Sequence, residues 1–442
     1  MTSSLGFKPH YNFVLEQFKS YKLVVLFFGL AIWVFIPIVG IFPLLLFVQL
    51  NLLSQQKHRD RSLLGFGINN IVLLLVALTI TIFVSSFNIW GDTSIYIWDY
   101  KNLDITGIFG VKKYGSGWEF MTFLLAYPTF ILSNGSEFWF LFNHCLIINL
   151  LITFVISQSF SKNYYPLLLI FIFSTNLYYG QVFYMRHFLS NVFLMLAIAS
   201  LNNSRYIIGI FASIFSHLSN IIFSLVSLLF ILDERFLNII AAIKKQKVIF
   251  NILVIGGGIG FVVLFRVFGS SPFLQFLTNA IDLGINSNGD LGGYLQSRVS
   301  GYDGRLLEEE YRFPVMAVID TLIIGGLILY RNLKTANKTL LSLVGIYFIN
   351  LLGFIFVMLT GFNWRVCLLF FSLTGFFYLI ALDIRNRDIQ LALISWAVLR
   401  VFYFFFWLYR MNSNSYFVFF DGEPLNATIY DYLVFLFNSI IT

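Results

Sequence analysis

Long apolar runs recur along the whole chain, and they constrain its fold more than any other feature. A helix that crosses a membrane needs about 20 apolar residues, and many of these runs approach or exceed that length. Strand-type alternation is absent, and a segment in lipid must satisfy its own backbone hydrogen bonds, so we predict helices. Charged residues make up 11% of the chain, against roughly 25% in soluble domains. The sequence therefore predicts an all-α polytopic membrane protein, a single membrane domain over residues 1–442 with about 12 transmembrane or membrane-embedded helices.

Two of the apolar segments are interpreted as broken. Leu23–Leu53 contains Pro37 and Pro43 and is long for one span, so it is predicted to form a short hairpin. Ile207–Leu232 is predicted to form two half-helices that meet near His217–Asn220. The segments run approximately over Leu23–Leu53, Ile68–Phe87, Phe138–Ile156, Tyr165–Tyr179, Phe188–Leu201, Ile207–Leu232, Val248–Phe268, Val315–Leu329, Leu340–Thr360, Val366–Leu382, Leu391–Leu408 and Tyr430–Ile441.

Short basic loops set the predicted orientation, because such loops face the cytoplasm in most membrane proteins. These loops are Lys57–Arg61, Lys244–Lys247, Arg331–Lys338 and Arg385–Arg387. They account for most of the net charge of +7, so nucleic acid is not an expected partner. Two substantial segments, 88–137 and 269–312, are then predicted to lie on the outer side of the membrane. Within the first, Trp118–Leu132 is predicted to be a helix on the outer surface, and the second is expected to fold over an outer cavity.

Several arginines lie on the outer side, where the usual charge bias disfavours them. Any one of them is explained as well by a side chain that reaches to lipid headgroups. Together they indicate a substrate path, because guanidinium groups match phosphate oxygens in a bidentate way. We expect a lipid-linked phosphate or pyrophosphate to bind here. The substrate-binding candidates are Arg186, Arg266, Arg298, Arg305, Arg312 and Arg365, together with Tyr96 and Tyr294.

Three residues are candidates for proton transfer in the catalytic step: Asp92, Glu119 and His217. Asp92 and Glu119 each flank an apolar helix and so can be held at membrane level. His217 lies at the proposed helix break, and a broken helix at depth tends to line a cavity. A hydrogen-bonded structural role for His217 stays open. Asp99 and Asp104 are interpreted as solvated surface acids.

Other polar features receive structural interpretations. Arg400 lies deep in an apolar segment and is expected to pair with a polar group of another helix. Gly256–Gly260 lies inside an apolar span with no preceding strand, which favours close helix packing over phosphate binding. Cys145 and Cys367 are interpreted as packing residues. We see no metal-ligand cluster in the sequence, and we expect neither a metal nor a cofactor.

Several short motifs follow one another along the chain. They are Gly91–Tyr96 and Gly117–Phe120 of the first outer segment, the helix start Tyr184–Ser190, the histidine-ended helix Ile214–Ser219 and the late arginine motif Asn363–Val366. Their order resembles that of the EpsG-type Wzy polymerases of bacterial lipid-linked oligosaccharide repeat units. The resemblance covers roughly Ile68 to Leu382, and His187 and Ser190 depart from the family's usual Gln and Ala.

The resemblance implies a function and a setting. It implies glycosyl transfer on the periplasmic face from an undecaprenyl pyrophosphate-linked glycan to a lipid-linked repeat unit. It implies a fold related to the membrane-embedded (GT-C-like) glycosyltransferases, in a multi-pass protein of the bacterial cytoplasmic (inner) membrane. Membrane lipids surround the chain, and candidate protein partners are a chain-length regulator and a flippase.

Two other classes of function remain open. One is a related lipid-dependent glycan enzyme, either an O-antigen ligase or a transferase that uses a polyprenyl phosphate donor. A monophosphate-dependent transferase would be expected to show an acidic pair that holds a metal, whereas Asp92 has no adjacent acid. The other is a transporter or lipid-glycan flippase, for which internal repeats would be expected; we detect none.

Overall fold

A computed structural model gives the fold of the 442-residue chain. The chain divides into two compact units, one formed by Met1–Ser224 with Ser372–Thr442 and the other by Leu225–Phe371. This division does not test the prediction of a single membrane domain, which stays a prediction. The structure describes residues 19–55, 67–87, 92–109, 120–160, 164–174, 180–182, 184–201, 205–217, 220–221, 319–320, 322–328, 340–347, 351, 377–378, 387–411 and 425–441.

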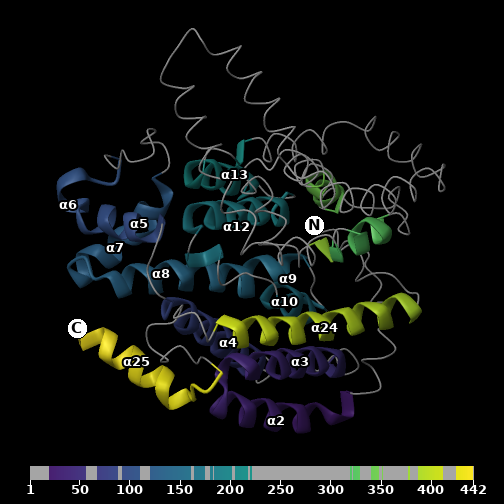
Figure 1. Ribbon diagram of the computed structural model, residues 1–442. Helices are drawn as coiled ribbons and strands as arrows, with labels where there is room; N and C mark the ends of the chain where they lie inside the picture. The colour runs from purple at the N-terminus through teal and green to yellow at the C-terminus, as the bar shows by residue number, and fades with distance from the viewer. Residues whose placement is uncertain are drawn as a thin grey trace, which may run out of the picture. The chain divides into compact units, whose positions relative to one another are not determined.

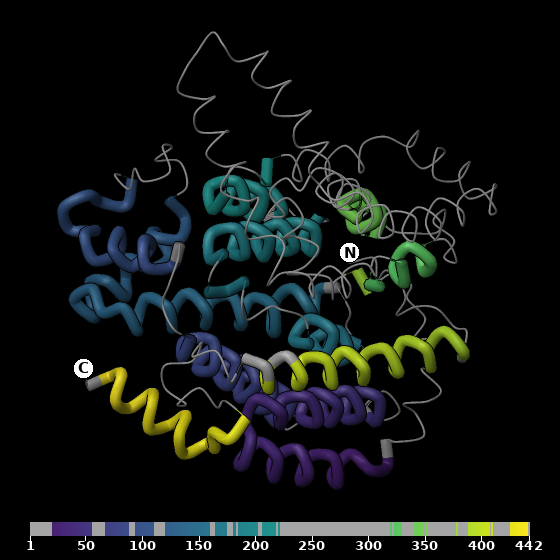
Figure 2. The backbone as a smooth tube through the Cα atoms, in the orientation of Figure 1, coloured from purple at the N-terminus to yellow at the C-terminus, as the bar shows by residue number. Residues whose placement is uncertain are grey.

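The elements of the described residues are all helices (Figure 1). Those of the first unit are η1 (Lys19–Tyr21), α2 (Lys22–Phe35), α3 (Pro37–Gln55), α4 (Gly67–Ser85), α5 (Asp92–Lys101), α6 (Leu103–Thr106), α7 (Met121–Ser133), α8 (Glu137–Leu150), the π-helical η3 (Leu151–Ile156), α9 (Ser157–Phe160), α10 (Tyr165–Phe173), α12 (Met185–Ala199), α13 (Arg205–Ser216), α24 (Arg387–Met411) and α25 (Ile429–Ile441). The helix α8 and its continuation η3 contact α4, α5, α7 and α12 between them, so this long helix is the central element of the unit (Figure 2).

The first two helices form the hairpin that was predicted inside Leu23–Leu53. The chain turns at Ile36, because a residue that precedes a proline disfavours the α conformation, and Pro37 begins α3. The two helices pack against each other. A Cβ atom at Gly40 would come within 2.4 Å of the Trp33 Cα, so this close approach requires glycine. The hairpin prediction is confirmed.

Four helices of the described residues are long and apolar enough to cross a membrane: Pro37–Ser54, Gly67–Ser85, Glu137–Ser159 and Asp388–Phe406. The third is α8 continued through η3 and α9. Shorter apolar helices accompany them, among them α7, which covers most of the predicted surface helix Trp118–Leu132. These helices confirm the prediction of an all-α membrane protein, while the total of about 12 such helices is not tested.

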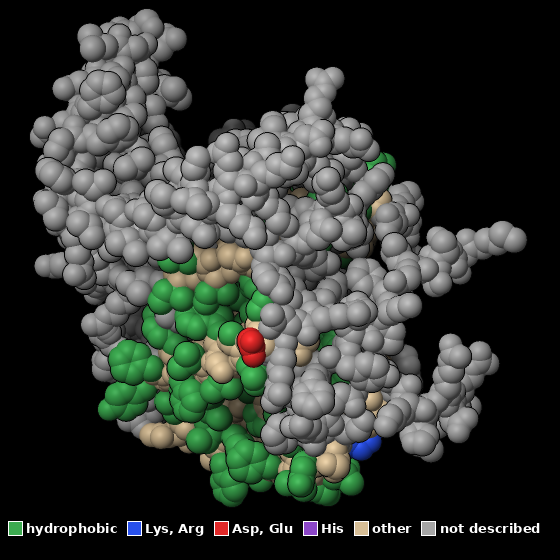
Figure 3. Space-filling model, turned by 90° about the vertical axis from the view of Figure 1, so that its right-hand side faces the viewer, with side chains coloured by type: hydrophobic (Ala, Val, Ile, Leu, Met, Phe, Trp, Pro, Cys, Tyr) green, Lys and Arg blue, Asp and Glu red, His purple; other side chains and the backbone are tan. Residues whose placement is uncertain are grey.

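The outside of the described helices carries large apolar side chains. Phe27 on α2, Phe402 on α24 and Phe437 on α25 are each more than half exposed. Hydrophobic side chains fill most of the described surface in the space-filling view, with isolated charged groups among them (Figure 3). Such contiguous apolar surface is unfavourable in water. In lipid it is the expected covering of a membrane protein.

Helices α12 and α13 form a second hairpin. They approach so closely that a Cβ atom at Gly209 would lie 2.8 Å from the backbone nitrogen of Ala197. The helix α13 ends at Ser216, and the next described helical residue is Asn220. The first part of the predicted segment Ile207–Leu232 therefore ends next to His217, where the prediction places the break, while the second half-helix lies almost wholly outside the described residues and stays a prediction.

The C-terminal helices complete the first unit. Phe404 of α24 packs edge-on against Phe42 of α3, with ring centroids 5.9 Å apart. Arg400 in the middle of α24 is buried and interacts with other groups of the protein, while its expected pairing with a polar group of another helix stays a prediction. The helix α25 is capped by Thr428, whose backbone N–H and hydroxyl both donate to Asp431 Oδ2 at 2.7 Å.

The second unit is described only in two helical stretches, 322–328 and 340–347, with a few further residues. They belong to the predicted spans Val315–Leu329 and Leu340–Thr360. The span Val248–Phe268, the Gly256–Gly260 stretch and the outer segment 269–312 lie outside the described residues. The predictions made for them stay predictions.

Candidate functional site

Arg186 is the charged residue around which a candidate site can be built. It is the second residue of α12, and its side chain is buried. Its Nε–H donates to the Tyr96 hydroxyl at 3.1 Å, and its Cζ lies 5.0 Å from the centroid of the same ring. A desolvated cation–π contact is worth about 2 kcal/mol, and a hydrogen bond to a charged group about 1.5–3 kcal/mol. Tyr96 therefore helps to compensate the burial of the guanidinium.

The helix α5 brings Tyr96 to this position. Thr93, Tyr96, Ile97 and Tyr100 are buried at the i, i+3, i+4 and i+7 spacing of one helix face. The Thr93 hydroxyl donates to the backbone carbonyl of Val182, just before α12 begins. The start of α5 is thus tied to the segment that leads into Arg186.

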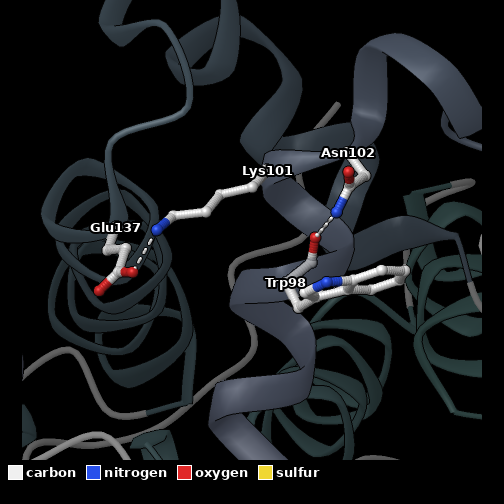
Figure 4. A network of polar contacts seen from close by, with 4 residues as sticks. All are labelled: Trp98, Lys101, Asn102 and Glu137. Atoms are coloured by element: carbon white, nitrogen blue, oxygen red, sulfur yellow. Dashed lines mark hydrogen bonds and ion pairs between the residues drawn. The ribbon is translucent and has the colours of Figure 1, made fainter.

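An ion pair holds the other end of α5. Lys101 pairs with Glu137, the first residue of α8, and the Asn102 side chain donates to the Trp98 carbonyl at 2.7 Å (Figure 4). Both charged side chains are about half exposed, so the pair contributes at most about 1 kcal/mol. Its effect is to fix the orientation of α5 against α8.

Two histidines meet where α13 ends. The rings of His187 on α12 and His217 lie with their centroids 4.7 Å apart in an edge-to-face arrangement. His187 is buried next to Arg186 in the sequence. The contact places two titratable rings at the helix break, adjacent along α12 to the buried guanidinium.

A buried polar network continues from these histidines along the α12–α13 hairpin. The Ser190 hydroxyl donates to the Ser213 carbonyl at 2.6 Å. The Asn220 side-chain amide donates to Asn191 Oδ1 at 2.9 Å and to Ser213 Oγ at 3.3 Å. Buried polar groups fix a unique packing when they are hydrogen-bonded. This network holds the chain on both sides of the break against α12.

The arrangement supplies a buried cation, an aromatic ring and two imidazoles in one region of the first unit. A guanidinium that is fixed in position, as Tyr96 fixes that of Arg186, can bind an anionic oxygen. An imidazole can in general accept a proton near neutral pH. In the part of the chain that the structure describes, no cluster of three or more His, Cys, Asp or Glu could hold a metal ion.

The structure describes three of the sequence-predicted site residues with their side chains. Arg186 and Tyr96 are in direct contact, and His217 lies against the residue that follows Arg186. Asp92 is the first residue of α5, and its side chain is not described. The other candidates lie outside the described residues: Glu119, Arg266, Tyr294, Arg298, Arg305, Arg312 and Arg365.

Two residues of this region were misjudged from the sequence. Asp99 was interpreted as a solvated surface acid, but it is buried at 6% exposure and has an interaction partner, so this interpretation is wrong. Asp104 is exposed, as predicted. His187 was noted only as a departure from a motif, although its ring contacts His217. The three-residue spacing from Tyr96 to Asp99 is the signal that could have indicated a shared helix face.

Comparisons with known proteins identify no family for this chain. No family model, no curated protein and no solved structure matches the chain.

Proposed function

We propose that this protein is a membrane-embedded glycosyltransferase that polymerises oligosaccharide repeat units linked to undecaprenyl pyrophosphate. The observation that carries the proposal is Arg186, a guanidinium buried at the start of α12 and held by Tyr96. A charged group buried within a membrane protein marks a path for an oppositely charged substrate. The resemblance of the motif order to EpsG-type Wzy proteins supports a lipid-linked pyrophosphate as that substrate.

The transfer step needs positive charge at the leaving group. The bond between the anomeric carbon of the growing glycan and the pyrophosphate oxygen breaks, and its electron pair leaves with undecaprenyl pyrophosphate. Arg186 stabilises this developing charge, together with Arg298 and Arg365, which are assigned from the sequence alone.

The acceptor hydroxyl must lose its proton as its oxygen bonds to the anomeric carbon. Asp92 begins α5 four residues before Tyr96, about one helical turn, and it is the first candidate for the base. His217 is the second candidate, because it lies at the helix break beside His187. Glu119, also of the first outer segment, is the third.

The proposal includes a fold and a setting. The chain is proposed to place about 12 helices in or on the membrane, in a fold related to GT-C-like glycosyltransferases. It works in the bacterial cytoplasmic membrane with its site on the outer face, without a metal or cofactor. A flippase supplies its lipid-linked substrate, and a chain-length regulator is its proposed protein partner.

A polymerisation assay tests the proposal. Purified protein receives a polyprenyl pyrophosphate-linked repeat unit, and the products are separated by length. The wild type is expected to give a ladder of products. Arg186→Lys keeps the positive charge but loses the paired N–H donors of the guanidinium, so its rate of ladder formation is expected to be at least about tenfold lower. Trp98→Phe is the control, because Trp98 lies on α5 and its side chain is exposed.

The other outcomes distinguish the alternatives. A wild-type ladder with a normal ladder from Arg186→Lys contradicts the role of Arg186. A wild type that transfers one preformed glycan and makes no ladder indicates a ligase. Movement of the intact lipid-linked unit across a bilayer, without any glycosyl transfer, indicates a flippase.

A further inference from the structure

A stripe of small side chains, most of them polar, lies on the buried side of the long helix α8–η3–α9. None of its residues belongs to the candidate site. Cys145, Asn149, Thr153 and Ser157 follow one another at intervals of four residues, and all four side chains are fully buried. They lie within the candidate membrane span Glu137–Ser159. Three consecutive turns of a membrane-embedded helix thus bury a polar side chain on the inside.

The π-helical segment explains how these residues share one side of the helix. In an α-helix, each step of four residues advances about 40° beyond a full turn, so a stripe with this spacing drifts around the axis. The segment Leu151–Ile156 is π-helical, and its wider turns hold more residues. It therefore offsets the drift and keeps Thr153 and Ser157 on the buried side with Asn149. Single π turns of this kind are frequent at functional sites.

The polar groups of the stripe differ in their partners. Asn149 is anchored, since its Nδ2 donates to Thr81 Oγ1 at 3.1 Å and its Oδ1 accepts from Gln181 Nε2 at 3.0 Å. The hydroxyls of Thr153 and Ser157 have no hydrogen-bond partner, nor does His144 Nε2 one residue before the stripe. An unsatisfied buried hydroxyl is unfavourable, and native proteins satisfy most such groups with a protein partner or, where none is in reach, with ordered water.

The spacing of the stripe fits bridging water. Four residues rise by about 6 Å along an α-helix and by less in the wider π turns. One water that accepts or donates two hydrogen bonds of about 2.8 Å spans a similar distance. A single water between two successive polar side chains would therefore bridge them, and it would have the two or more polar partners that a buried water needs.

We propose that Asn149, Thr153 and Ser157 bind a file of buried water molecules along the inside of α8–η3–α9. The file is a water-binding site within the membrane-embedded part of the protein, and it does not depend on the proposed glycosyl transfer.

The sign of a stability change tests this proposal. Thr153→Val keeps the shape of the side chain and removes only the hydroxyl. If the hydroxyl binds water, the variant loses those hydrogen bonds and its melting temperature in detergent falls by several degrees. If the site is dry, removal of an unsatisfied hydroxyl raises the melting temperature or leaves it unchanged, and either result overturns the proposal.

Two further measurements make the result decisive. Thr122→Val on α7 is the matched control, because Thr122 is also buried without a partner for its hydroxyl but is not part of a stripe; its melting temperature is expected to rise or stay the same. A high-resolution map of the wild type requires no variant. We expect water density within hydrogen-bond distance of Thr153 Oγ1 and Ser157 Oγ, and a well-defined map with only carbon atoms around both oxygens would overturn the proposal.

Discussion

Tyr96 holds Arg186 in two separable ways, through its ring and through its hydroxyl. Tyr96→Phe keeps the ring and removes the hydrogen bond to Nε. We expect it to slow polymerisation roughly tenfold, since a hydrogen bond to a charged group is worth about 1.5–3 kcal/mol and 1.4 kcal/mol is a factor of ten. Tyr96→Leu removes both contacts and should be slower still.

Initial rates of ladder formation measure this effect. Trp98→Phe is the control, because Trp98 lies on the same helix but is exposed. Equal rates for wild type, Tyr96→Phe and Tyr96→Leu would show that Tyr96 does not position the guanidinium for the reaction.

At the scale of residues, only part of the candidate site could be predicted from the sequence. Arg186 and His217 were predicted because a charge or a lone histidine is conspicuous in an apolar sequence, and Tyr96 because it belongs to the motif Gly91–Tyr96. The burial of Asp99 depends on which face of α5 packs against its neighbours, and the three-residue spacing from Tyr96 is the local signal of that face. The ring contact of His187 with His217 likewise requires the antiparallel packing of α12 on α13.

Gly209 sets the separation of α12 and α13, and so the geometry of the buried network between them. A Cβ atom there would lie within 2.9 Å of the backbone nitrogen, Cα and Cβ of Ala197. Backbone atoms cannot move aside as a side chain can, so we expect Gly209→Ala to destabilise the protein by about 1–3 kcal/mol, as overpacking does. Thermal unfolding in detergent measures this change.

Gly67→Ala is the matched control for the helix packing. Gly67 begins α4, and no atom lies within 4 Å of a Cβ built there. Because alanine is also the better helix former, this variant should be as stable as the wild type or more stable. Equal stability of Gly209→Ala and wild type would show that the hairpin has room to open at this point.

At the scale of elements, the sequence was most informative where backbone chemistry forces the outcome. Pro37 disfavours an α conformation at Ile36, so the first hairpin could be predicted. A break near His217 was predicted because the orientation of the basic loops fixes how many times the chain crosses the membrane. The π-helical turns of Leu151–Ile156 could not be predicted, because their residues show no distinctive pattern. The segment contacts α4 and α12.

At the scale of the whole molecule, orientation is the property that the proposed function requires. We expect the Arg331–Lys338 loop to face the cytoplasm and the 269–312 segment to face outward, because basic loops stay inside. With Cys145 and Cys367 replaced by alanine, an impermeant thiol reagent added to intact cells should label Asp290→Cys and spare Lys334→Cys. Labelling at position 334 but not at 290 would reverse the orientation and remove the site from the outer face.

The chain-length distribution of surface glycan, in native cells that lack this protein, tests the polymerase function most directly. We expect the long glycan ladder to collapse to single repeat units, to return with the wild-type protein and to stay collapsed with Arg186→Lys. Ladders of unchanged length in the deletion strain would contradict the polymerase function.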